Sequence, residues 1–206
     1  ADGKQFRRSV CGAGACLYAL KMLLYSVSSP HGRRKGHGPM QFFLKQSTGT
    51  ETLFTVSDSR GHAVYSVTGS VSSLGRRFAL LNADGEEAAK ILCVPLSRTA
   101  QYSVFVGDGR GEKDKALVSV NPSAAHRPVS IRGVKWRFRG SVPARSFDLV
   151  DAQSHTVLTH GRCWNTGGDC YAVEIPSEAD VLLGLSIAVI IDSTAVTGMP
   201  AAVPAG

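Results

Sequence analysis

The feature that most constrains the fold of this chain is an apolar run of eleven residues near its C-terminus. The run extends from Val181 to Ile191 and contains no charged residue. As a helix it is apolar on every side, so it cannot lie on a water-facing surface. Eleven helical residues rise only about 16 Å, against about 30 Å for a bilayer core. The run therefore predicts a helix buried inside the protein. Its predicted core side chains are Val181, Leu182, Leu183, Leu185, Ile187, Val189, Ile190 and Ile191.

The residues that flank this run indicate where the helix begins. Ser177 is the predicted cap of the first turn, because its hydroxyl can accept a hydrogen bond from a free backbone N–H. Asp180 follows three residues later, and Glu178 is an acid that the helix dipole favours. The alternative is a short strand, since Ile187–Ile191 is rich in β-branched residues. The capping residues and the length of the run favour the helix. Asp192, which follows the run, has no such explanation.

Between Met40 and the apolar run, the chain is patterned as short strands. Turn sequences at Asp58–Gly61, Asn82–Gly85 and Asp151–Ser154 separate alternating segments, as in β-hairpins. Such regular spacing predicts a barrel or a sandwich, and the apolar helix favours a barrel closed around it, because closure removes exposed strand edges. The predicted fold class is mainly β: a closed antiparallel β-barrel of about twelve strands around a central hydrophobic C-terminal α-helix. The predicted strands are Gln41–Gln46, Leu53–Val56, Ala63–Val67, Phe78–Leu81, Ala88–Val94, Tyr102–Val106, Ala116–Val120, Val129–Gly133, Val134–Gly140, Phe147–Val150, Thr156–Thr159 and Tyr171–Ile175.

Charge and composition divide the chain into three parts. Residues 1–39 hold seven of the 23 Lys and Arg but one of the 16 Asp and Glu, so they carry +6 of the net charge of +7. The predicted organisation is a basic N-terminal extension at 1–39, a barrel domain at 40–193 and an Ala/Pro-rich tail at 194–206. An organelle-targeting or secretory role of the extension is the alternative, because an apolar stretch at 13–27 follows two arginines. Since the barrel domain is close to neutral, nucleic acid is not an expected partner.

The five cysteines are an odd number spread over the whole chain, which does not describe a disulfide scaffold. Reduced thiols in a cytoplasmic protein are the simpler interpretation. Cys163 and Cys170 flank a turn, so they can face each other across a hairpin and even form a bridge. His155 and His160 lie nearby, but the spacing of these four residues does not match a paired zinc motif. The sequence therefore predicts no metal site and indicates no cofactor.

Four segments of the chain resemble a known family. M-Q-F-F-L-K-Q at Met40 and the segment Leu53–Glu87 are similar to the opening of LURP-one-related proteins. Phe138–Asp151 and Tyr171–Asp192 are similar to the second half of that family. The resemblance implies the tubby C-terminal-like fold, a closed β-barrel threaded by a hydrophobic C-terminal helix, with tubby proteins and phospholipid scramblases as distant relatives. It implies no catalytic residue, because the family has no catalytic motif to match.

The strand expected over Val134–Gly140 alternates cations with aromatic residues. In a strand, this alternation places the three cations on one face and the two aromatic side chains on the other. The row of cations is a candidate site for anionic headgroups or phosphates, and a solvated outer face is the alternative. The candidate anion-binding residues are Arg132, Lys135, Arg137 and Arg139, with a weaker second group at Arg76 and Arg77 beside Lys90.

These observations favour a non-enzymatic, soluble binding module of LURP-one-related type that recognises anionic phospholipid headgroups or a phosphorylated ligand. One alternative is a scramblase-like, membrane-associated protein in which Val181–Ile191 would enter lipid. The other is a hydrolase that uses His155 or His160. The sequence contains no G-x-S-x-G motif, and Gly107–Lys113 lacks the G-K-[S/T] ending of a phosphate-binding loop.

Overall fold

The structure of the chain is a computed structural model that describes residues 38–47, 52–72, 75–94, 99–107, 114–124, 126–165 and 168–197. The described residues form twelve β-strands, a short 3₁₀ turn and one α-helix. The elements are β1 (Met40–Gln46), β2 (Thr52–Asp58), β3 (Ala63–Ser72), β4 (Gly75–Asn82), β5 (Glu87–Cys93), β6 (Ala100–Val106), β7 (Asp114–Val120), β8 (Val129–Arg132), β9 (Arg137–Ser141), β10 (Ser146–Val150), β11 (Thr156–Asn165), β12 (Gly168–Ile175), η1 (Glu178–Asp180) and α2 (Val181–Thr197).

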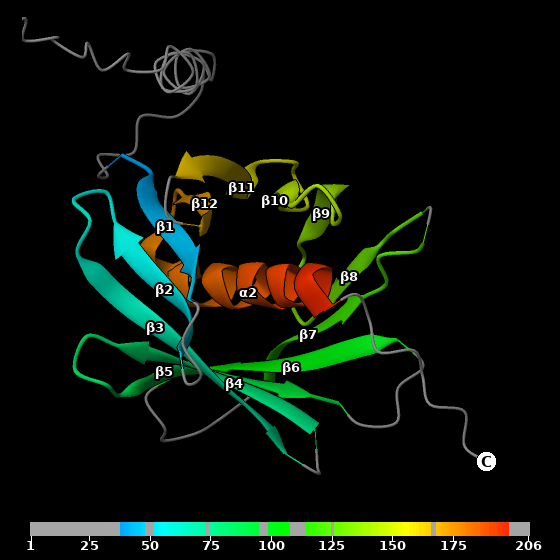
Figure 1. Cartoon of the computed structure of the whole chain (residues 1–206). Coiled ribbons are helices and arrows are strands. Elements are labelled where there is room, and N and C mark those ends of the chain that lie inside the picture. The colour runs from blue at the N-terminus through cyan, green and yellow to red at the C-terminus, as the bar shows by residue number, and fades with distance from the viewer. Residues whose placement is uncertain are drawn as a thin grey trace, which may run out of the picture. The chain divides into compact units, whose positions relative to one another are not determined.

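All twelve strands belong to one antiparallel sheet in the order β8-β7-β6-β5-β4-β3-β2-β1-β12-β11-β10-β9. The pairing of β1 with β12 joins the first strand to the last and places Met40 opposite Ile175. The sheet curls around α2 as a nearly closed barrel, which confirms the predicted fold class (Figure 1). The strands β8 and β9 stand at the two ends of the order and are connected by residues 133–136. We call the place where these two end strands meet the seam.

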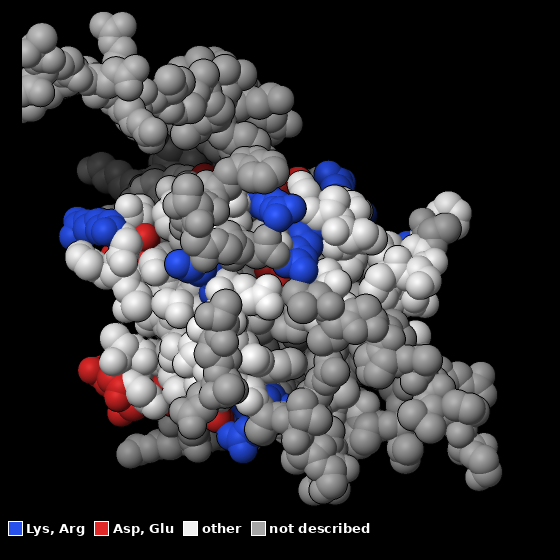
Figure 2. All heavy atoms as spheres, in the orientation of Figure 1, with Lys and Arg blue, Asp and Glu red and all other residues white. Residues whose placement is uncertain are grey.

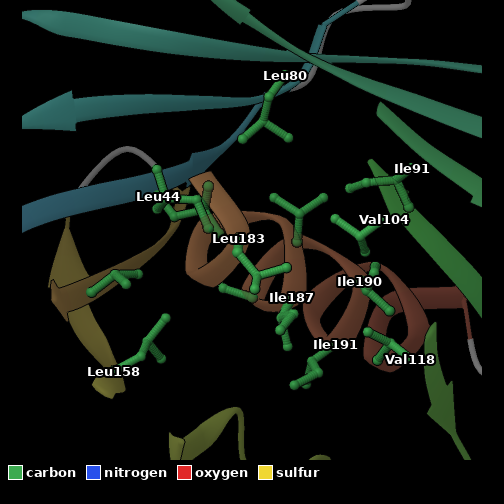
Figure 3. Close-up of a cluster of buried hydrophobic side chains, with 14 of the residues drawn as sticks. Leu44, Leu80, Ile91, Val104, Val118, Leu158, Leu183, Ile187, Ile190 and Ile191 are labelled. Carbon is green, nitrogen blue, oxygen red and sulfur yellow. The ribbon is translucent and has the colours of Figure 1, made fainter. Parts of the chain in front are cut away.

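The helix α2 runs through the middle of the barrel (Figure 1). Seven of the eight predicted core side chains of the helix are buried, and Leu182 is half-buried. Strands β4 to β7 contribute Leu80, Ile91, Val104 and Val118, which are fully buried and lie around the helix (Figure 3). Burial on every side is what an all-apolar helix requires, so the apolar run is the centre of the core.

Both ends of the helix differ from the prediction. The predicted cap is wrong: the side chain of Ser177 makes no capping hydrogen bond, and the chain enters the helix through the 3₁₀ turn η1. The backbone N–H of Asp180 donates to the carbonyl of Ser177 instead, at 3.1 Å. At the other end, α2 continues to Thr197, past the boundary drawn at residue 193. It can do so inside the barrel because the hydroxyl of Thr194 donates to the carbonyl of Ile190, at 2.7 Å, which satisfies it within the helix.

The strand predicted at Val134–Gly140 is shorter than expected, because β9 begins only at Arg137. The preceding Gly133 has a φ of +98°, a conformation that favours glycine. A Cβ at this position would also lie 2.5 Å from the carbonyl oxygen of Lys115. The chain therefore bends at Gly133 as it leaves β8, and the new strand starts after that bend.

Candidate functional site

The four cations of the main candidate group lie beside the seam. Arg132 is the last residue of β8, Lys135 is in the connection 133–136, and Arg137 and Arg139 are in β9. All four side chains are exposed. The two aromatic residues between them, Trp136 and Phe138, are half-buried and pack against the core. The alternation predicted from the sequence is therefore present, although it begins before the strand does.

No carboxylate forms an ion pair with this group within the part of the chain that the structure describes. The described ion pairs involve other residues, and none of them includes Arg132, Lys135, Arg137 or Arg139. The nearest acid in register is Asp148, which stands opposite Arg139 across the β9–β10 pair. On the face drawn in Figure 2, Lys and Arg form small separate groups between uncharged residues. The Lys and Arg residues that can be seen in this view therefore do not form one continuous basic face.

The second predicted group does not form a comparable site. Arg77 in β4 makes an ion pair with Glu87, with 2.7 Å between Nη2 and Oε2. The side chain of Arg76 lies outside the described part of the structure. A guanidinium that already has a carboxylate partner has less free charge to offer an anion, so the first group is the stronger candidate.

Two of the four cations converge on the turn between β10 and β11. The Nη2 atom of Arg137 lies 3.4 Å from each of three oxygens: the carbonyls of Asp151 and Ala152 and the hydroxyl of Ser154. The Nη2 atom of Arg139 lies 3.2 Å from the same Ser154 hydroxyl. All three side chains of this cluster, Arg137, Arg139 and Ser154, are exposed. We call these three residues the Arg–Ser cluster.

The turn that carries Ser154 is held by its first residue. The Oδ1 atom of Asp151 accepts hydrogen bonds from the backbone N–H groups of Gln153 and His155, at 2.9 and 2.8 Å. The Oδ2 atom of Asp151 lies 3.2 Å from Nδ1 of His155. Desolvation works to raise the pKa of Asp151, but the hydrogen bonds from His155 and Gln153 outweigh it and hold the pKa below its ordinary value. Both oxygens of this carboxylate therefore contact groups of its own turn.

A buried polar cluster lies inside the barrel and was not predicted from the sequence. His160 of β11 and Asp192 of α2 are fully buried side chains, with 3.0 Å between Nε2 and Oδ2. The imidazole is stacked between the rings of Phe147 and Tyr171, at centroid distances of 4.4 and 5.1 Å. The guanidinium of Arg145 lies 5.2 Å from the centre of the Tyr171 ring and donates to its hydroxyl. The cluster thus connects the helix to β10, β11, β12 and the turn before β10.

The hydrogen bonds of His160 determine how many hydrogens the His160–Asp192 pair carries. Its Nδ1 lies 3.0 Å from the carbonyl oxygen of Arg145, which can only accept, so Nδ1 carries a hydrogen. A second hydrogen must lie between Nε2 and the carboxyl oxygen of Asp192. Imidazolium with carboxylate and imidazole with carboxylic acid both meet this requirement, and both are neutral overall. A neutral pair is the arrangement in which burial costs least.

The proposed catalytic use of His160 or His155 finds no support in this geometry. His160 is 1% exposed, and both of its ring nitrogens are occupied, so its ring does not face solvent. His155 is exposed, and its contact with Asp151 is explained by the turn. Within the described ranges, no three His, Cys, Asp or Glu residues are grouped to hold a metal ion.

Cys163 and Cys170 face each other, as the sequence allowed. They are directly opposite in the β11–β12 pairing, and both are free thiols. Burial, followed by the hydrogen bond and charge of Cys170, raises the pKa of Cys163 to about 12. Such a thiol is protonated at neutral pH, so it is a weak nucleophile.

In the described part of the chain, no helix is both long enough and apolar enough to span a bilayer.

Comparisons with known proteins identify a family, a relative and a similar solved structure. The model of the LURP-one-related family matches residues 40–192. An uncharacterised Bacillus subtilis protein, YxjI, is 23% identical over 154 residues, which cover 74% of this chain and 92% of YxjI. A crystal structure of a protein from Arabidopsis thaliana is similar with a TM-score of 0.55 and 16% identity, covering 76% of this chain and 92% of that one. At that identity, the likeness to the plant protein shows the fold alone.

Proposed function

This chain belongs to the LURP-one-related family, and we propose that its barrel is a non-enzymatic binding module that recognises a phosphate-bearing anionic ligand through the cations beside the seam. The source of phosphate that we test first is the anionic phospholipid headgroup. The observation that carries the proposal is the lack of any carboxylate partner for Arg132, Lys135, Arg137 and Arg139 in the described structure, although all four are exposed.

The charge balance of the chain supports a local site. Outside residues 1–39 the chain carries 16 basic and 15 acidic residues, which is a net charge of +1. In a domain that is nearly neutral overall, several cations without ion-pair partners in one place create a local positive potential that attracts an anion. Each exposed cation near an anionic membrane surface contributes about 1 kcal/mol. The expected binding is therefore weak and falls as salt is added.

The test compares variants of the full chain for sedimentation with phosphatidylserine vesicles. Replacing Lys135, Arg137 and Arg139 with Ser should reduce vesicle binding by about two orders of magnitude and leave the melting temperature nearly unchanged. The matched control replaces Lys45, Arg60 and Arg162 with Ser, since these are also exposed cations in the described structure. It removes the same charge from elsewhere and should reduce binding far less. The basic segment 1–39 can bind anionic lipid unaided, so the variants are also compared as residues 40–206, and the reduction of about two orders of magnitude is expected there.

Protection of the sheet edges is the competing explanation of these cations. Charged side chains on edge strands prevent two molecules from pairing edge to edge, and β8 and β9 are the end strands of this sheet. If that is their role, the triple variant should bind vesicles like its parent and form oligomers that light scattering detects. That result would overturn the proposed function.

A further inference from the structure

Resting on the proposed function, we propose that Ser154 is a ligand-contacting residue of the site, and that the Arg–Ser cluster selects phosphomonoesters over phosphodiesters. Three hairpin turns of the barrel share one backbone frame. They are Asp58–His62, Asn82–Glu86 and Asp151–His155. In each turn, the first residue donates its backbone N–H to the carbonyl of the fifth, at 2.9 Å.

Side chains repeat the same frame in all three turns. The Oδ1 atom of the first residue accepts from the backbone N–H groups of the third and fifth residues, at 2.8 to 3.0 Å. The backbone N–H of the fourth residue donates to the carbonyl of the first, at 3.0 to 3.1 Å. The three turns are therefore equivalent position by position. The residue at any position of one turn can be compared with the residues at the same position in the other two turns.

The fourth position is where the third turn differs. It is Gly61 in the first turn and Gly85 in the second, with φ of +85° and +81°. In the third turn it is Ser154, with a φ of +69°. Left-handed backbone disfavours any residue with a Cβ, and glycine adopts it freely. The third turn thus carries a strained serine at a position where the same frame twice has the unstrained residue. Strain of this kind is typical of functional positions.

The serine hydroxyl is what distinguishes this turn from the others. It accepts from the guanidinium groups of Arg137 and Arg139, at 3.4 and 3.2 Å, and no carboxylate lies within ion-pair distance of either in the described structure. Two cations therefore converge on one neutral oxygen. The hydroxyl keeps its own hydrogen to donate, and each guanidinium has further N–H groups besides the Nη2 in these contacts.

Three donor groups at one place match the chemistry of a phosphomonoester. A monoester has three terminal oxygens and a charge near −2 at neutral pH, and guanidinium groups pair with such oxygens in two-point contacts. A phosphodiester offers two terminal oxygens and one negative charge, so its charge-assisted contacts with the same three donors are fewer and weaker. The carboxylate of Asp151 is held by its own turn, and Asp148 is the other acid near the cluster, opposite Arg139.

The experiment uses the full chain, its Ser154→Gly variant and a reciprocal control. Glycine removes the hydroxyl and the strain together, so Ser154→Gly should melt within about 2 °C of the parent or above it. The control, Gly61→Ser, introduces the same strained residue into the first turn, where Arg60 is exposed and no arginine side chain in the described structure makes a hydrogen bond to the fourth position. It should lower the melting temperature and leave ligand binding unchanged.

Ligand selection is measured on phosphatidylcholine vesicles that contain either phosphatidic acid, a monoester, or phosphatidylglycerol, a diester, at matched surface charge. The parent should bind the phosphatidic acid vesicles about tenfold more tightly, the effect of one charge-assisted hydrogen bond. Ser154→Gly should bind both kinds of vesicle equally.

Inorganic phosphate, titrated at constant ionic strength, distinguishes the sources of the monoester. Displacement of the parent supports recognition of soluble phosphate as well, and preference in the vesicle arm alone supports recognition of the lipid headgroup.

Three results would overturn the inference. If the parent binds the two kinds of vesicle equally and Ser154→Gly changes nothing, the selection is absent and the proposed function still stands. If Ser154→Gly melts well below the parent, the hydroxyl supports the fold and not a ligand. If the parent binds neither vesicle nor phosphate, the inference and the proposed function fall together.

Discussion

The Nε2 atom of His160 lies 3.0 Å from Oδ2 of Asp192, and neither side chain is exposed to solvent. The two residues are 32 positions apart, one on the strand β11 and one near the end of the helix α2. This contact is a polar link between the helix and the barrel wall. Because apolar packing alone is nearly non-directional, a single buried pair of this kind can determine how far the helix is inserted and how it is rotated.

The first prediction concerns this pair. Asp192→Ala should cost about 3 to 5 kcal/mol of unfolding free energy, because it leaves the buried imidazole of His160 without its partner. Replacing both residues with Ala should cost less than the sum of Asp192→Ala and His160→Ala, since the double variant leaves neither buried partner uncompensated. Chemical denaturation of the four proteins in this cycle measures the coupling. Additive costs would show that the two side chains act independently.

The apolar helix could be predicted from the sequence, because Val181–Ile191 has a composition that few environments accept. The polar pair could be predicted only in part. Asp192 follows the apolar run directly, and a carboxylate that enters a core needs a partner. His160 lies two residues after Leu158, so it shares the inward face of its strand. Which partner Asp192 meets depends on the position of the helix in the barrel, and local patterns do not contain that information.

The Arg–Ser cluster, like the polar pair, could be predicted from the sequence only in part. The alternation of cations and aromatic residues indicated which way Arg137 and Arg139 point, because strand periodicity is local. The sequence D-A-Q-S-H also has the frame of D-S-R-G-H, with Ser in place of Gly, and this was a signal that sequence reasoning missed. The meeting of the arginines with Ser154 depends on the β9–β10 register, in which Arg137 stands opposite Val150. That register is a tertiary property.

The second prediction concerns the centre of the helix. Leu185 is fully buried, and Leu185→Asp should prevent folding, because an unpaired charge inside the barrel costs several kcal/mol. Arg60, in the exposed first turn, is the control: Arg60→Glu should change the unfolding free energy by about 0.5 kcal/mol or less. Expression and a thermal melt of both variants are the measurements. A cooperative melt of Leu185→Asp near that of the parent would show that the helix is not the centre of the core.

The third prediction compares a glycine of β9 with a glycine of β11, two strands that both pair with β10. Gly140 of β9 has a φ of +133°, and a Cβ there would lie 2.6 Å from Cα of Phe147 and still closer to the carbonyl of Ser146. Gly140→Ala should therefore cost about 3 kcal/mol, from strain and overlap together. A Cβ on Gly161 of β11 would meet nothing within 4 Å, so Gly161→Ala should be tolerated within about 1 kcal/mol. Denaturant titration measures both. Equal costs for the two variants would contradict the close packing of β9 against β10 at Gly140.

The last prediction concerns acid stability and uses the second turn as an internal reference. The backbone N–H of His62, ahead of its other contacts, lowers the pKa of Asp58 below its ordinary value of 3.8. A carboxyl whose pKa is lowered by folding stabilises the protein above its unfolded pKa, and that contribution is lost as the pH falls through the folded value. Asp58 and Asp151 should therefore support the fold fully above about pH 4 and progressively less below it.

Asn82 accepts the same two backbone hydrogen bonds in its own turn, through a side chain that does not ionise. The double variant Asp58→Asn, Asp151→Asn should for that reason keep both turns, melt at or slightly below the parent at pH 7, and lose less stability than the parent between pH 4 and pH 2. Thermal melts of the two proteins across this range are the measurement. Parallel pH curves would show that the two aspartates are as easily protonated in the folded chain as in the unfolded one, because only a change in pKa on folding couples protonation to stability.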